Sequence, residues 1–165
     1  MKNLNNPNEM LPKEFIQNVL ITEFQDIVFR HQYLSFALVS IGIEFLGKCL
    51  LKNAKDWKSW QMDPTKAFNR GMDLMIEVDE KYKNLKLKEL RNGFAHTLVP
   101  KAFTLSEIIH GDIHLAMNET TQKKILVAEI FYRDFVVACN KIIDMEFPSP
   151  DKMNEPLLKF IKKNI

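Results

Sequence analysis

Apolar residues recur at helical spacing along most of the chain. The pattern begins after Pro12 and continues to about Leu51, and polar and charged residues interrupt it near 30–33. This interruption predicts two consecutive helices. The second is apolar almost all round, which is typical of a helix buried at the centre of a domain.

Three later segments repeat the helical pattern. Asp63 followed by Pro64 is a typical helix start, because it supplies an N-cap residue and a proline at the first helical position. Two further helices are expected over 84–98 and 128–145, and prolines follow the last turn of each.

Residues 101–127 interrupt this helical pattern. Two short apolar runs, 103–105 and 124–127, flank the segment 114–117, which lies between two turn-like stretches. This pattern predicts a small β-hairpin with 118–121 as its loop. The elements together predict an all-α fold. We expect an antiparallel up-and-down helical bundle of four to five main helices, with the hairpin as an insert near 101–127.

A single domain accounts for the chain length. We expect a flexible leader at 1–11, the helical bundle at 12–145, and a C-terminal extension at 146–165 that contains a short helix over 154–164.

The composition is that of a globular domain, with 46% hydrophobic residues among 165 and a net charge of +2. This balance gives no overall field that would draw the chain to nucleic acid, so a local patch would have to do so. The five glycines stand alone, which excludes a glycine-rich phosphate loop. The first residues lack an apolar signal segment, and the longest uncharged run, 33–43, is too short to cross a bilayer. We therefore expect a cytoplasmic protein without membrane contact.

A histidine pair lies in the insert. His110 and His114 are four residues apart, the spacing that places two imidazoles on one helix face for a metal. Gly111 and the turn-like surroundings argue against a helix here, and no third ligand is evident. We therefore expect a surface hairpin at this position, with no metal and no cofactor.

The helix expected over 84–98 carries the densest candidate chemistry. Asn92 and His96 are four residues apart and share one side of the helix, and Arg91 projects beside them. Glu89, seven residues before His96, lies on the same strip. The periodicity alone favours a solvated helix face with an ordinary histidine.

This helix resembles a known signature. The motif Arg-Asn-x-x-x-His at 91–96, on a late helix of a small bundle, is similar to that of the HEPN superfamily (higher eukaryotes and prokaryotes nucleotide-binding). The segment 40–51 is similar to the earlier helix of that family, with Glu44 and Lys48 one turn apart among apolar residues. The resemblance covers the whole predicted bundle.

For many members the resemblance implies a metal-independent endoribonuclease that works in toxin–antitoxin, defence or RNA-processing settings. It implies that Arg91, Asn92 and His96 are the catalytic residues and that the protein is a homodimer. The alternative is a catalytically inactive module that binds a nucleotide, RNA or a protein partner such as an antitoxin or a nucleotidyltransferase. Leu98 favours that alternative, because several active relatives have tyrosine at this position.

The residue types suit RNA cleavage by the neighbouring 2′-hydroxyl. A histidine such as His96 exchanges protons near neutrality, and the planar fork of Arg91 can bind two phosphate oxygens. One histidine cannot act as base and acid in the same step, which argues for two chains meeting at the site. The candidate supporting residues are Glu44, Lys48 and Glu89. Glu44 either pairs with Lys48 inside the bundle or orients His96.

A run of lysines precedes the motif. Lys81, Lys83, Lys86 and Lys88 could hold an RNA backbone, and Tyr82 among them could offer a stacking face. A solvated linker and first helical turn is the alternative interpretation.

Overall fold

The computed structural model describes residues 10–51, 63–100, 102–147, 152–155 and 157. The described chain is mostly helical, as the sequence predicts. Its longer helices are α2 (Phe24–Arg30), α3 (Gln32–Leu50), α4 (Pro64–Val78), α5 (Leu87–Thr97) and α6 (Ala128–Asp144). The short elements are α1 (Pro12–Phe15), the π-helical η1 (Ile16–Glu23), the 3-10 turns η2 (Glu80–Tyr82), η3 (Ile108–His110) and η4 (Lys152–Asn154), and the strands β1 (Phe103–Ser106) and β2 (Lys124–Val127).

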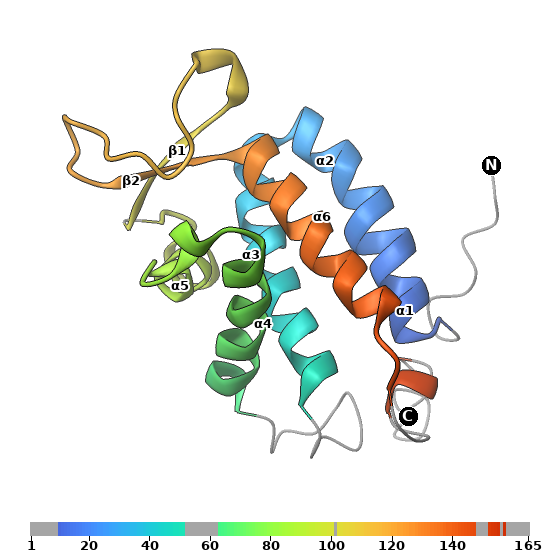
Figure 1. Cartoon of the computed structure of the whole chain (residues 1–165). Coiled ribbons are helices and arrows are strands. Elements are labelled where there is room, and N and C mark those ends of the chain that lie inside the picture. Colours follow the sequence, from blue (N-terminus) through green and yellow to red (C-terminus); the bar gives the residue numbers. More distant parts are fainter. Residues whose placement is uncertain (1–9, 52–62, 101, 148–151, 156, 158–165) are drawn as a thin grey trace.

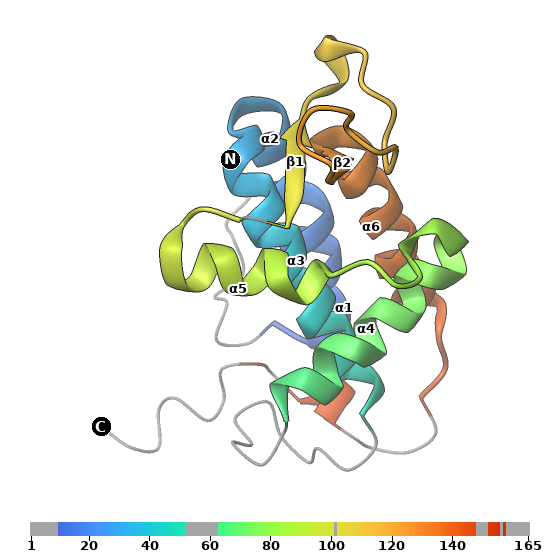
Figure 2. The ribbon, with the colours of Figure 1, turned by 90° about the vertical axis from the view of Figure 1, so that its left-hand side faces the viewer.

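Helix α3 runs through the middle of the molecule and packs against α2, α4, α5 and α6 (Figures 1 and 2). Its side chains Phe36, Val39, Ile43 and Leu46 are buried in the core. The predicted interruption near 30–33 is confirmed, because α2 ends at Arg30 and α3 begins at Gln32. By length and composition alone, α3 could cross a membrane, and 56% of its apolar window is buried inside the protein. A buried core helix passes the same test.

Two glycines allow α3 and α4 to touch through their backbones. A Cβ atom on Gly47 would lie 1.7 Å from the carbonyl oxygen of Ala67, and one on Gly71 would lie 1.9 Å from that of Ile43. No side chain fits between the helices at these points, so the distance between α3 and α4 is fixed. This contact holds Glu44, one turn before Gly47, close to the N-terminal end of α4.

The start of α4 is as predicted, with Asp63 as its N-cap: the Oδ1 atom of Asp63 accepts a hydrogen bond from the N–H of Thr65 at 2.8 Å. Helix α5 begins three residues later than the sequence predicts. Asn84 has a left-handed backbone with φ 66°, which ends the preceding turn and delays the helix. At the other end, Leu98 takes the left-handed conformation with φ 56° and the helix stops at Thr97.

The two apolar runs do not form a hairpin with each other, because β1 and β2 pair in parallel, with Phe103 opposite Lys124. The antiparallel contact across the predicted loop is an isolated bridge between Met117 and Lys124. The connection between β1 and β2 leaves the sheet and returns before β2 starts, forming the loop that projects from the helices in Figure 1. A tight turn does occupy the predicted loop. The Oδ1 atom of Asn118 accepts hydrogen bonds from the N–H groups of Thr120 and Thr121, and the Asn118 N–H donates to the carbonyl of Lys123 at 2.8 Å.

Helix α6 matches its predicted range closely. Most of the predicted leader and most of the helix expected at 154–164 lie outside the described residues. At the end of the leader, Met10 is buried, and its carbonyl accepts a hydrogen bond from the N–H of Leu157 at 3.1 Å.

Candidate functional site

Helices α3 and α5 bring three charged side chains of the predicted site together. The Oε2 atom of Glu44 accepts a hydrogen bond from Nη2 of Arg91 at 2.9 Å, and its Oε1 atom lies 3.0 Å from Nζ of Lys48. The Glu44 side chain is 10% exposed, whereas those of Arg91 and Lys48 are each 31% exposed. Glu44 therefore uses both oxygens for cations and does not orient His96.

Asn92 holds the other side of the arginine. Its Oδ1 atom accepts a hydrogen bond from Nη1 of Arg91 at 3.1 Å. The guanidinium is thus fixed between a carboxylate and an amide, and no other residue that the structure describes accepts a hydrogen bond from its remaining N–H groups. The structure describes no hydrogen bond between Asn92 and His96, so the amide does not fix the imidazole tautomer.

A small hollow lies next to the guanidinium, between α5 and the start of α4. Glu44, Arg91, Asn92 and Lys88 line it together with Thr65, and its volume is about 40 Å³. The Nζ atom of Lys88 donates a hydrogen bond to Oγ1 of Thr65 at 3.0 Å. The hollow has room for water or for the oxygen atoms of one anionic group, and is too small for a nucleotide.

His96 lies one turn further along α5, on the surface. Its side chain is exposed and forms no hydrogen bond or ion pair with any residue that the structure describes. Nearby, the Oη atom of Tyr33 donates to the carbonyl of Leu98, and the Tyr33 ring contacts Phe94 edge-on at 5.2 Å between centroids. The imidazole is therefore held at a defined place on the helix while both of its nitrogens stay available.

The remaining candidates do not gather at this site. Glu89 is exposed and pairs with Lys86 at 3.4 Å, away from Arg91. The predicted lysine strip is divided, because Lys88 reaches α4 while Lys81 and Lys83 line a different cavity.

Tyr82, between those two lysines, is fully buried, so the predicted stacking face is wrong. Its Oη atom donates a hydrogen bond to Oδ2 of Asp134 at 2.9 Å and lies 2.9 Å from Nε2 of His114. The Nδ1 atom of His114 accepts from the N–H of Val127 at 3.0 Å, so the proton is on Nε2 and is donated to Tyr82. A chain of hydrogen bonds thus connects the insert, η2 and α6.

Burial determines the protonation states of the three side chains in this chain of hydrogen bonds. It lowers the pKa of His114 to about 4, so the imidazole is neutral at pH 7. Burial, reinforced by the charge of Asp134, raises the pKa of the Tyr82 hydroxyl, and burial also raises the pKa of the Asp134 carboxyl.

Sequence analysis did not identify this chain of hydrogen bonds, and it placed His114 on the surface, whereas the side chain is half-buried. His110 is exposed while His114 points inward, so the two imidazoles do not share a face. One signal was available: Asp134 falls within the apolar stripe of α6, between Phe131 and Ala138, where an acidic residue needs a buried partner. Over the described ranges, no group of three or more potential metal ligands is present.

Comparisons of the chain with protein-family models, curated proteins and solved structures give no match.

Proposed function

We propose that this protein is a metal-independent endoribonuclease of the HEPN type, which cleaves RNA by attack of the 2′-hydroxyl at a cleft between two copies of an antiparallel helical bundle. The observation that carries the proposal is the fixed Arg91 guanidinium, held by Glu44 at 2.9 Å and by Asn92 at 3.1 Å, one turn from the exposed His96. The toxin–antitoxin, defence or RNA-processing role and the cytoplasmic location belong to the same proposal.

The fixed guanidinium places positive charge beside the phosphate, where negative charge develops during the reaction. Arg91 retains N–H donors for a phosphate oxygen, and Glu44, Lys48 and Arg91 together carry one net positive charge. This charge stabilises the additional negative charge of the pentacoordinate phosphorus in the transition state. Holding the guanidinium before substrate arrives avoids the cost of ordering it during the reaction.

His96 performs the proton transfer. One copy of His96 removes the proton of the 2′-hydroxyl, and the second copy protonates the 5′-oxygen that leaves. Because neither imidazole nitrogen is engaged with a described residue, each histidine can act in either role. The products are a 2′,3′-cyclic phosphate and a free 5′-hydroxyl.

An apolar surface close to the motif supports dimerisation. On α3, Tyr33, Leu34 and Ile41 are 48%, 53% and 56% exposed, and after α5, Leu98 and Val99 are 70% and 55% exposed. Tyr33 connects the two groups through its bond to the carbonyl of Leu98. Exposed apolar surface of this kind is typical of interfaces, and a second copy seated here would bring the two histidines toward each other.

The first experiment incubates purified protein with total RNA in EDTA. Wild type is expected to cleave RNA and leave cyclic-phosphate ends, and His96→Ala is expected to lower the rate at least about a hundredfold, as for loss of a general acid–base group. His110→Ala is the matched control, since His110 is an exposed histidine on the insert. Equal cleavage by wild type and His96→Ala would contradict the proposal, and so would loss of activity in both histidine variants.

The second candidate function is an inactive HEPN module that binds a nucleotide, RNA or a protein partner. The size of the hollow favours it, because about 40 Å³ beside Arg91 leaves a single chain without a formed substrate cleft. A monomer in solution that cleaves no RNA and forms a stable complex with an antitoxin or a nucleotidyltransferase would support this alternative.

A further inference from the structure

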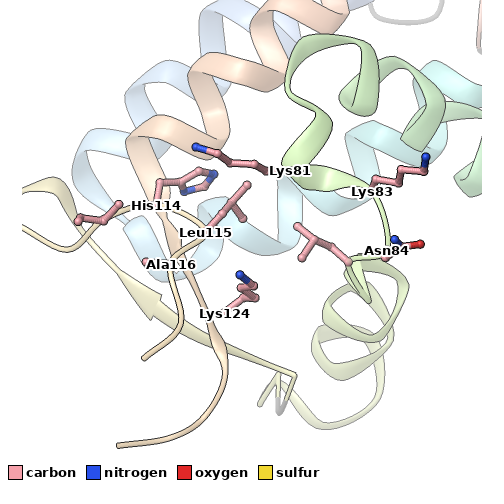
Figure 3. A pocket seen from close by; sticks show the side chains of 9 residues that line it. Lys81, Lys83, Asn84, His114, Leu115, Ala116 and Lys124 are labelled. Carbon is pink, nitrogen blue, oxygen red and sulfur yellow. The ribbon is translucent and has the colours of Figure 1, made fainter. Parts of the chain in front are cut away.

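The larger cavity that Lys81 and Lys83 line belongs to a different part of the molecule from His96. It lies between the chain at 81–85, the insert at 113–116 and the start of β2, and its volume is about 480 Å³ (Figure 3). This volume is within the range of small-molecule sites, about 300–1,000 Å³. The cavity is therefore large enough for a whole small ligand.

Three lysines and no carboxylate line the cavity. Figure 3 shows the amino groups of Lys81 and Lys124 on the side of His114 and Leu115, whereas Lys83 extends the other way. None of the three lysines forms an ion pair with the described chain. Leu85, Ile113 and Leu115 provide apolar walls between these charges. Unneutralised ammonium groups beside an apolar wall are complementary to an organic anion.

The walls of this cavity are held rigidly. His114 is bonded through both nitrogens, to Tyr82 and to the N–H of Val127, so it cannot rotate. Leu115 takes a left-handed backbone with φ 63°, which is unfavourable for a leucine, and the hydrogen bond from its N–H to the carbonyl of Ile125 at 2.7 Å retains it. Strained backbone that the surroundings hold in place occurs often at ligand sites.

We propose that this cavity binds a phosphate monoester of a small organic molecule, with the phosphate between Lys81 and Lys124 and the organic part against Leu85 and Leu115. A monoester carries close to two negative charges at pH 7 and matches two ammonium groups, whereas each diester of an RNA backbone carries one. His114 positions the wall, and its neutral ring leaves the positive charge to the lysines. The site does not depend on RNA cleavage at His96.

The test titrates phenyl phosphate into the full chain and follows binding by calorimetry and by the backbone amide resonances of Leu115 and Val127. Saturable binding at one site is expected, with phenol binding far more weakly. Lys124→Gln is expected to weaken binding at least about tenfold, as for loss of one charge-assisted hydrogen bond. Lys123→Gln, the adjacent lysine outside the cavity, is expected to leave the affinity unchanged.

In this titration, the proposal is overturned by no binding to wild type at millimolar phenyl phosphate, by equal weakening in the Lys124→Gln and Lys123→Gln variants, or by equal binding of phenol. Thermal unfolding of each variant shows whether it is folded, and Lys81→Gln provides a second test at a position where the side chain is exposed.

Single-stranded RNA with and without a 5′-phosphate separates the two sources of phosphate. Displacement of phenyl phosphate only by the 5′-phosphorylated strand supports a monoester site. Equal displacement by both strands would assign the cavity to the RNA backbone and contradict the proposal. His96→Ala is expected to bind phenyl phosphate as wild type does, so an inactive nuclease and an empty cavity are distinguishable outcomes.

Discussion

His96 and His114 illustrate two different uses of the same side chain. His96 is exposed at the end of α5 and makes no bond with the described residues, whereas His114 is bonded through both nitrogens inside the protein. The first has the freedom that proton transfer requires, and the second has the fixed geometry that a structural residue requires. A motif in the sequence marked only the first, because the contacts of the second come from distant parts of the chain.

The charged groups around the two histidines also differ. Near His96, the carboxylate of Glu44 partly neutralises two cations, and one of these, Arg91, is held in place. Near His114, Lys81 and Lys124 face a cavity without any acidic lining residue. The α5 site therefore holds one arginine between two partners, whereas the lining of the cavity has an excess of positive charge.

The largest effect on stability is expected from loss of the buried hydrogen bonds that join Tyr82 to Asp134 and His114. Tyr82→Phe removes the hydroxyl that binds Asp134 at 2.9 Å and contacts His114 at 2.9 Å, so a buried acceptor and a buried donor lose their partner. Each such loss costs about 1–3 kcal/mol, and we expect the free energy of unfolding to fall by about 3 kcal/mol. Urea denaturation measures this change.

Tyr33→Phe is the matched control. It removes one hydroxyl that bonds to the carbonyl of Leu98 at an exposed position, so a change below about 1 kcal/mol is expected. Equal destabilisation by both variants would show that the buried hydrogen bonds of Tyr82 contribute no more to stability than the exposed one of Tyr33.

The next effect is a dependence of stability on pH. The pKa of His114 is about 4 in the folded protein and 6.5 when unfolded, so between these values the unfolded chain binds more protons. Stability therefore falls as the pH is lowered through this window, by roughly 2 kcal/mol for a partly exposed ring. The raised pKa of Asp134 acts in the opposite direction, because its carboxyl binds a proton more readily in the folded state.

Urea denaturation at pH 7, 6, 5 and 4.5 measures this dependence. His114→Gln is expected to be less stable than wild type at pH 7, and this difference should shrink as the pH falls. A constant difference across the series would show that His114 does not gain a proton on unfolding.

A smaller effect is expected at the α3–α5 contact. Glu44→Gln removes the charge that pairs with Arg91 and Lys48, although the amide oxygen can still accept one hydrogen bond. We expect a loss of about 1 kcal/mol, because both cations are partly exposed to water. Glu89→Gln, in the exposed pair with Lys86 at 3.4 Å, should change stability by less than about 0.5 kcal/mol. A larger loss in Glu89→Gln than in Glu44→Gln would contradict the importance of the α3–α5 pair.

The helices could be predicted because their signals are local. The N-cap at Asp63 and the break before Gln32 depend on neighbouring residues, and both are present in the structure. The pairing of β1 with β2 depends on the path of the chain between them, and no local pattern distinguishes a parallel pair from a hairpin. The start of α5 was misplaced because Asn84 takes a left-handed backbone, which the apolar spacing does not record.

In the candidate site too, contacts within one helix were predictable, whereas contacts between helices were not. Spacing along α5 placed Arg91 and Asn92 together, and the structure joins them at 3.1 Å. The contact of Arg91 with Glu44 crosses between two helices, so the sequence left the partner of Glu44 open. Glu89 was assigned to the same strip from spacing alone, and its pairing with Lys86 shows that a shared helix side does not ensure a contact.

The smallest expected effect is that of His96→Ala on stability. The side chain is exposed and bonds to no described residue, so its removal should change the free energy of unfolding by less than about 0.5 kcal/mol. His114→Ala, by contrast, removes two hydrogen bonds and should cost several times more. Urea denaturation of both variants at pH 7 measures the contrast. A His96→Ala protein as stable as wild type but unable to cleave RNA would assign the imidazole to the reaction, whereas a large loss of stability would mean that His96 supports the fold.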